Sequence, residues 1–144
     1  MSVFADSSAV VKLYADEPGN AAIRRLEVLL VSCLARVEVP TAIWRKRRRG
    51  ELTAEQADVL AAAFEVDYRG TDDEPPRFVV VGIVPELLDD AVVLARAHGL
   101  RAYDAVQLAS ARAARAVDPS CDGFACADRS LRAAAITEQF RVIG

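Results

Sequence analysis

The stretch SVFADSSAVV at residues 2–11 predicts a short buried strand that ends at a carboxylate and passes directly into a helix. Residues 3–5 are an apolar run with good strand propensity, and Ser7 or Ser8 is a suitable N-cap for the helix. Asp6 therefore stands where a strand meets a helix. Ligands of open α/β sheets bind outside the carboxyl ends of the strands, so Asp6 is a candidate site residue. The same carboxylate could instead only cap the helix.

Composition limits the kind of protein this is. The 144 residues, 53% hydrophobic and 27% charged, predict one globular domain spanning residues 1–144. No apolar run approaches the roughly 20 residues that span a bilayer, and no basic start precedes a long apolar region, so we expect a cytoplasmic protein without membrane contact. Cys33, Cys121 and Cys126 form no CxxC pair, which argues against a disulfide framework or a structural zinc site.

The rest of the chain predicts an alternation of strands and helices. Further strands are expected at residues 29–33, 78–83, 123–127 and 140–143. Helices are expected at 20–27, from about 34 to 50, from the capping box at 53–56 to about 64, and at 85–98, 105–116 and 130–135. This order predicts an α/β fold with a mostly parallel central sheet.

Three further acids stand at similar junctions. Glu38 lies near the start of the helix after the second strand, Asp104 in a first helical turn, and Asp128 between a strand and a helix. In a parallel sheet these junctions gather along one edge, although an acid at a helix start is also ordinary. Clustered carboxylates cannot all stay ionised unpaired, and oxygen ligands alone suit Mg²⁺ or Mn²⁺ better than zinc. The candidate metal ligands are Asp6, Glu38, Asp104 and Asp128.

A basic run, WRKRRR at residues 44–49, ends the helix that carries Glu38. If the helix is continuous, Arg45 lies on nearly the same face as Glu38, about 10 Å along the axis. Arg45, with Lys46 or Arg48, could then bind a phosphate that lies beside the acids, although the net charge of -3 argues against a nonspecific nucleic-acid coat. The alternative is a solvated helix end that is favourable against the helix dipole.

Four short motifs resemble those of a known family. The DSS sequence at residues 6–8, Glu38 within RVEV, YDA at 103–105 and AD at 127–128 are similar to the four acidic motifs of PIN domains. Within that superfamily the chain is most similar to VapC-type toxins of bacterial toxin-antitoxin pairs. The DEPG loop at 16–19 and HGL at 98–100 also resemble that group, and the resemblance covers nearly the whole chain.

The resemblance implies a three-layer α/β/α fold and a metal-dependent endoribonuclease. It also implies a homodimer, silenced by a cognate antitoxin whose C-terminal segment enters the active-site groove. By this resemblance, one or two Mg²⁺ or Mn²⁺ ions are held by Asp6, Glu38, Asp104 and Asp128, most directly by Asp6 and Asp104, and Ser7 assists by hydrogen bonding. Many relatives carry Thr or Ser two residues before the fourth acid, where this chain has Cys126, a weaker hydrogen-bond partner.

Other classes fit the sequence less well. A haloacid-dehalogenase-like phosphatase would need a second Asp where this chain has Ser8, and the acidic pair and lysine of a receiver domain are not well placed. The only histidine, His98, is expected to help cap a helix end, and no Ser or Cys motif points to a catalytic triad. The remaining alternative is a non-catalytic or degenerate PIN-like binding module, whose acids are helix caps. Such a module would gain little stability from Mn²⁺.

Overall fold

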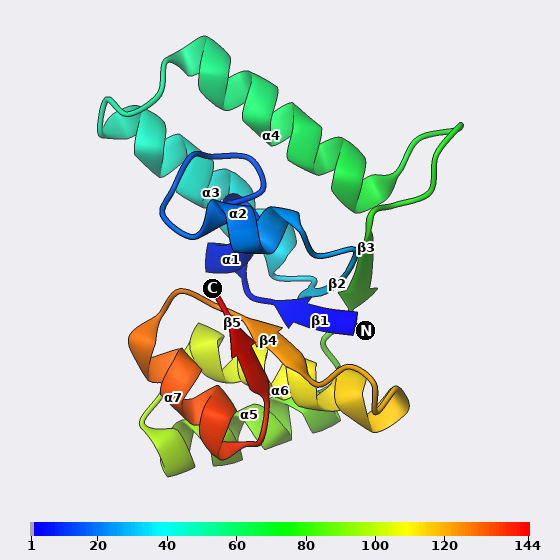
Figure 1. Cartoon of the computed structure of the whole chain (residues 1–144). Coiled ribbons are helices and arrows are strands. Elements are labelled where there is room, and N and C mark those ends of the chain that lie inside the picture. Colours follow the sequence, from blue (N-terminus) through cyan, green and yellow to red (C-terminus); the bar gives the residue numbers. More distant parts are fainter. Residues whose placement is uncertain (1) are drawn as a thin grey trace.

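The computed structural model describes residues 2–144, in which five strands and seven helices alternate (Figure 1). Their bounds are β1 Ser2–Ala5, α1 Ser7–Val11, α2 Asn20–Arg24, β2 Val28–Ser32, α3 Ala35–Arg48, α4 Ala54–Arg69, β3 Phe78–Val81, α5 Pro85–His98, α6 Ala102–Val117, β4 Gly123–Ala125, α7 Arg129–Thr137 and β5 Arg141–Ile143. In this part of the chain, no helix is both long and apolar enough to cross a membrane.

The five strands form one parallel sheet in the order β3-β2-β1-β4-β5. The chain builds outward from β1 to β3, then returns and adds β4 and β5 on the other side of β1. This reversal makes the gap between β1 and β4 the topological switch point, where ligands of such sheets bind. The parallel sheet confirms the predicted fold class.

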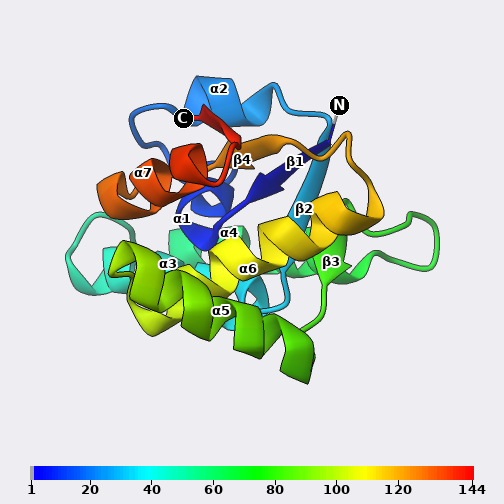
Figure 2. The ribbon, with the colours of Figure 1, turned by 90° about the horizontal axis from the view of Figure 1, so that it is seen from below.

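Helices cover both faces of the sheet. In Figure 1, α1 to α4 lie on one side and α5 to α7 on the other, which confirms the three-layer α/β/α arrangement. Successive residues of a strand point to opposite faces of the sheet. Val3 therefore packs in the core beneath α1 to α4, and Phe4 packs in the core on the side of α5 to α7. The ring of Phe4 stacks on that of Phe124 with centroids 5.7 Å apart. Figure 2 shows α5 and α6 side by side beneath the sheet.

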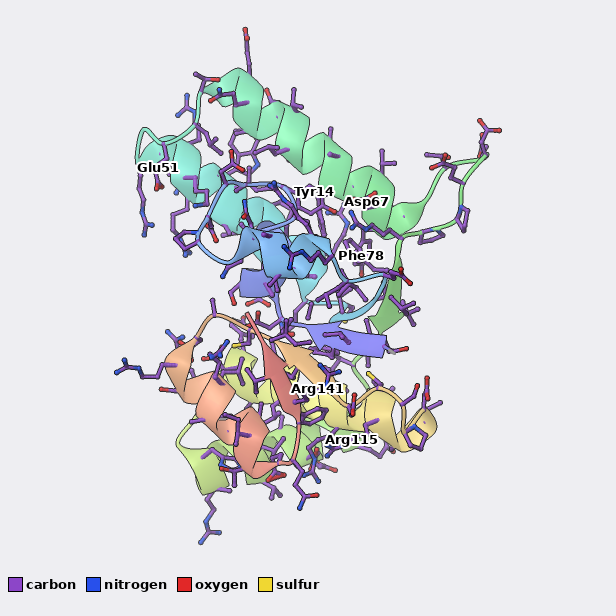
Figure 3. All side chains as sticks on the ribbon, viewed as in Figure 1. Tyr14, Glu51, Asp67, Phe78, Arg115 and Arg141 are labelled. Atoms are coloured by element: carbon purple, nitrogen blue, oxygen red, sulfur yellow. The ribbon has the colours of Figure 1, made fainter. Side chains whose placement is uncertain are left out.

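The long helix α4 is fastened at its C-terminal end. Tyr14 Oη donates a 2.6 Å hydrogen bond to Asp67 Oδ2, and both side chains lie where α4 meets the sheet (Figure 3). Burial and the Asp67 carboxylate raise the pKa of Tyr14, so its hydroxyl keeps its proton. Phe64 packs edge-on against Tyr14 and also contacts Phe78. These contacts explain why α4 continues to Arg69, beyond its predicted end near residue 64.

Several local expectations are wrong. The helix at 20–27 ends at Arg24, and α6 begins at Ala102 rather than at residue 105. The N-cap of α1 is Asp6 itself, whose carboxylate accepts the Ala9 amide, in place of Ser7 or Ser8. His98 does not cap α5, because its side chain lies against Glu138, at 3.3 Å.

Candidate active site

Four junctions bring their acids to one cavity. Asp6 follows β1, Glu38 and Asp104 lie in the first turns of α3 and α6, and Asp128 is the N-cap of α7. All four line a cavity of about 600 Å³ at the switch-point edge of the sheet, where loops and helix N-termini converge. Other side chains that line it include Ser7, Ser8, Arg45, Arg101, Tyr103 and Gln107.

Asp6 is the most buried of these acids, with 4% of its surface exposed. Its Oδ1 accepts hydrogen bonds from Ser8 Oγ at 2.6 Å and from the Ala9 amide at 2.9 Å. Burial and, to a smaller extent, the nearby Asp104 charge raise the pKa of Asp6 to about 6, against the lowering effect of these donors and of the Cys126 thiol. Asp6 therefore loses its proton close to neutral pH, which suits a group that exchanges a proton for a cation.

Glu38 is held by two donors. Its Oε1 accepts hydrogen bonds from Ser7 Oγ and from Gln107 Nε2, each at 2.8 Å. Gln107 Nε2 also lies 3.1 Å from Ser7 Oγ, so the three side chains form a closed network. The predicted role of Ser7, assistance by hydrogen bonding, is thus directed at Glu38 in the structure.

Asp104 and Asp128 share one cation. Arg101 Nε and Nη2 both lie 3.1 Å from Asp104 Oδ2, and Nη2 lies 3.6 Å from Asp128 Oδ2. The other Asp128 oxygen, Oδ1, accepts the Leu131 amide at 2.9 Å and so caps α7. Asp128 therefore does two things at once, capping a helix and facing the cavity.

Cys126 does not remove Asp128 from the cavity. The thiol is buried, and its Sγ lies 3.5 Å from the main-chain oxygen of Asp128. Burial and the Asp6 charge raise the pKa of Cys126, so the thiol keeps its proton and can donate weakly. Ser8 Oγ also holds the segment between β4 and α7, because it accepts a hydrogen bond from the Ala127 amide at 3.2 Å.

The donor chemistry of the cavity fits a hard divalent cation. All four acids offer oxygen, and the Asp104 charge disfavours ionisation of Asp6, a conflict that a cation would relieve. Among residues 2–144, however, no three acidic, histidine or cysteine side chains converge as they stand in a way that could hold a metal ion. Instead, the acids are paired with Ser7, Gln107, Ser8 and Arg101.

Only one of the three predicted RNA-binding cations lies in the cavity. Arg45 lines the same wall as Glu38, as their spacing along α3 predicted. Lys46 faces a second cavity and pairs with Glu17 at 2.5 Å. Arg48 is exposed near the end of α3.

Two cavity residues, Arg101 and Gln107, escaped the sequence reasoning. Gln107 carried a usable signal, because it is a polar residue on the buried face of α6, one helical turn after Asp104. Its Oε1 has no hydrogen-bond partner among the described residues, which leaves a buried acceptor at the cavity wall. Arg101 carried no signal beyond its sequence proximity to Asp104.

A three-layer α/β/α domain with four junction acids in one cavity is the class that this fold and site define. Comparison with protein families agrees: the PIN domain family matches residues 3–136, and the chain belongs to this family. The chain is 29% identical over 115 residues to Ribonuclease VapC3 of Pyrobaculum aerophilum, a match that covers 77% of this chain and 82% of that protein.

A solved structure shows the same fold. The crystal structure of Mycobacterium tuberculosis VapC20, described as a sarcin-ricin loop cleaving toxin, superposes with a TM-score of 0.62 at 18% identity. The match covers 92% of this chain and 94% of that one. Together these comparisons confirm the resemblance to PIN domains and to the VapC-type proteins among them.

Proposed function

We propose that this chain is a metal-dependent endoribonuclease that acts in the cytoplasm as the toxin of a toxin-antitoxin pair, with residues 1–144 working as one domain. The observation that carries the proposal is the convergence of Asp6, Glu38, Asp104 and Asp128 on one cavity at the switch point of a PIN-family sheet. The likeness to a protein named as a ribonuclease supports RNA as the substrate.

The acids would hold Mg²⁺ or Mn²⁺, which supplies a bound water of lowered pKa and neutralises charge on the phosphoryl oxygens. Asp6 would give up its proton when the cation binds, because burial makes its unpaired charge unfavourable. Ser7 and Gln107 both donate to Glu38 Oε1 and so hold the carboxylate in one orientation. The second carboxylate oxygen, Oε2, would then be the one that binds the cation. One of these carboxylates would orient the attacking water.

Arg45 would bind a phosphate of the RNA that flanks the cleaved bond. Its guanidinium is exposed on the cavity wall, and phosphate contacts of this kind contribute affinity with little sequence selection. Arg48 could extend this track along the end of α3. Lys46 could join it only by leaving Glu17, so we expect a smaller part for Lys46.

A cognate antitoxin and a second copy of the chain are the protein partners that we propose. The VapC-type likeness supports both, and exposed apolar side chains on α5, among them Val92 and Val93, support a contact surface. Sedimentation of the isolated chain tests the homodimer directly. A monomer at micromolar concentration would contradict it.

Cleavage of a mixed RNA pool tests the nuclease. The antitoxin-free protein should cleave RNA in Mn²⁺ and should lose that activity in EDTA. Asp104→Asn keeps the shape of the side chain but removes its charge, so it should also abolish cleavage. Asp89→Asn removes an exposed acid of α5 outside the cavity and serves as the matched control, which should cleave like the unmodified protein.

Two outcomes would count against the proposal. Cleavage that survives both EDTA and Asp104→Asn would place the activity outside this cavity. No cleavage, together with no Mn²⁺ binding, would favour a non-catalytic binding module whose acids only cap helices.

A further inference from the structure

Arg101 lies at the entrance to the acid cluster. It is the N-cap residue of α6, and its side chain makes no capping hydrogen bond. The guanidinium instead turns to two acids from different elements, Asp104 on α6 and Asp128 before α7. One cation therefore links two of the four acids that line the cavity.

Arg101 contacts one oxygen of each carboxylate. Asp128 Oδ1 is used by the Leu131 amide, so Oδ2 is the oxygen directed at the cavity, and Arg101 lies against it. Asp104 Oδ2 receives both Nε and Nη2 of the same guanidinium. A divalent cation bound by both carboxylates would lie close to this guanidinium, which is unfavourable because like charges repel.

The contact is built to be reversible. The Arg101 side chain is 80% exposed, and ion pairs of exposed side chains are weak. The contrast is Glu38, whose partners Ser7 and Gln107 are buried. Arg101 can thus leave its acids without disturbing the core, whereas the Glu38 network cannot open without exposing buried donors.

We propose that Arg101 is a built-in counter-cation that competes with Mg²⁺ or Mn²⁺ for Asp104 and Asp128. In the metal-free protein its single positive charge offsets part of the negative charge of the two carboxylates, and it must move aside before both can bind one divalent cation. The metal affinity of the site is then set partly by this arginine. The inference rests on the proposed function, because it presupposes that these acids bind a divalent cation.

Titration calorimetry with Mn²⁺ alone, without RNA, tests the inference. Arg101→Gln should bind Mn²⁺ about fivefold more tightly than the unmodified protein, a change that corresponds to about 1 kcal/mol. Arg45→Gln is the matched control, since it removes the other cavity arginine, which has no acidic partner among residues 2–144. It should change the Mn²⁺ affinity by less than about twofold.

A thermal melt in EDTA provides a second reading. Arg101→Gln should melt at a lower temperature than the unmodified protein, because Asp104 and Asp128 lose their shared cation. Added Mn²⁺ should raise its melting temperature by more than it raises that of the unmodified protein. Arg101→Lys keeps the charge but loses the planar guanidinium that contacts both acids. Its Mn²⁺ affinity should therefore lie between those of the unmodified protein and Arg101→Gln. Circular dichroism verifies that each variant is folded.

The outcomes separate this inference from the proposed function. If Arg101→Gln binds Mn²⁺ no more tightly than the unmodified protein, or if Arg45→Gln tightens binding equally, the inference is wrong and the metal site stands. If neither the unmodified protein nor Arg101→Gln binds Mn²⁺, the proposed metal site is wrong and the inference falls with it.

Discussion

Gln107 Nε2 donates a 2.8 Å hydrogen bond to Glu38 Oε1, although the two residues are 69 positions apart. The same nitrogen lies 3.1 Å from Ser7 Oγ, so the amide joins the start of α1 to the first turn of α3. An apolar residue in its place would leave Glu38 with a single donor. Gln107 therefore holds Glu38, a candidate catalytic residue, in one orientation.

Replacing Gln107 with Leu separates this positioning role from folding. Leu keeps much of the volume and removes Oε1, a buried acceptor without a partner among residues 2–144, but it also removes both hydrogen bonds of Nε2, so the free energy of unfolding should fall by no more than about 1 to 2 kcal/mol, too little to unfold the protein. RNA cleavage should fall about 10-fold or more, since partners that orient ligand side chains have effects of that size. Urea denaturation and initial cleavage rates measure the two quantities. A loss of stability that parallels the loss of activity would contradict the positioning role.

The raised pKa of Asp6 predicts a pH-dependent stability. The folded protein holds this proton up to about pH 6, whereas the unfolded chain loses it near pH 3.8. The stabilisation from protonated Asp6 is thus complete below about pH 4 and is lost as the pH rises through about 6. Asp6→Asn does not titrate, so its stability relative to the unmodified protein should increase by about 2 to 3 kcal/mol between pH 4 and pH 7.

Urea denaturation at a series of pH values, in EDTA, measures this difference. Titration of other carboxylates affects both proteins, so comparing the two curves isolates Asp6. A stability difference that does not change with pH would mean that the pKa of Asp6 is not raised.

Ser8 should control how readily Asp6 ionises. Its hydroxyl donates to Asp6 Oδ1, and this hydrogen bond is the largest effect that lowers the pKa of Asp6. Ser8→Ala should therefore raise the pH at which Mn²⁺ binding reaches half its maximum, by roughly one unit for a hydrogen bond to a charged group. Ser7→Ala is the matched control, because Ser7 donates to Glu38 instead. Equal shifts in both variants would contradict the role of Ser8 in setting the pKa of Asp6.

Arg45 and Lys46 are neighbours that should differ in RNA binding. In an Asp104→Asn background, where cleavage should be absent, Arg45→Gln should weaken binding and lower the slope of log affinity against log salt by about 0.7. Lys46→Gln should have a smaller effect, because the Lys46 ammonium is already paired with Glu17 and only 17% of its side chain is exposed. Filter binding at several salt concentrations compares them. A larger effect of Lys46→Gln would reverse their roles.

The sheet and its junctions were predictable because their causes are local. The apolar run at residues 3–5 is followed at once by helix-forming sequence, so Asp6 had to stand at the carboxyl end of a strand. The same reasoning placed Asp128 before α7. Boundaries failed where distant contacts extend a helix, as when Tyr14 and Phe78 secure the end of α4.

By itself, the sequence determined the alternation of strands and helices, the parallel sheet and the position of each acid at a junction. Propensity, capping and periodicity act over a few residues and can be read along the chain. Only the tertiary structure decided the partner of each acid: Gln107 for Glu38, Arg101 for both Asp104 and Asp128. Those choices depend on which surfaces the folded sheet brings within hydrogen-bond distance, and that geometry is not written in the spacing of residues along the chain.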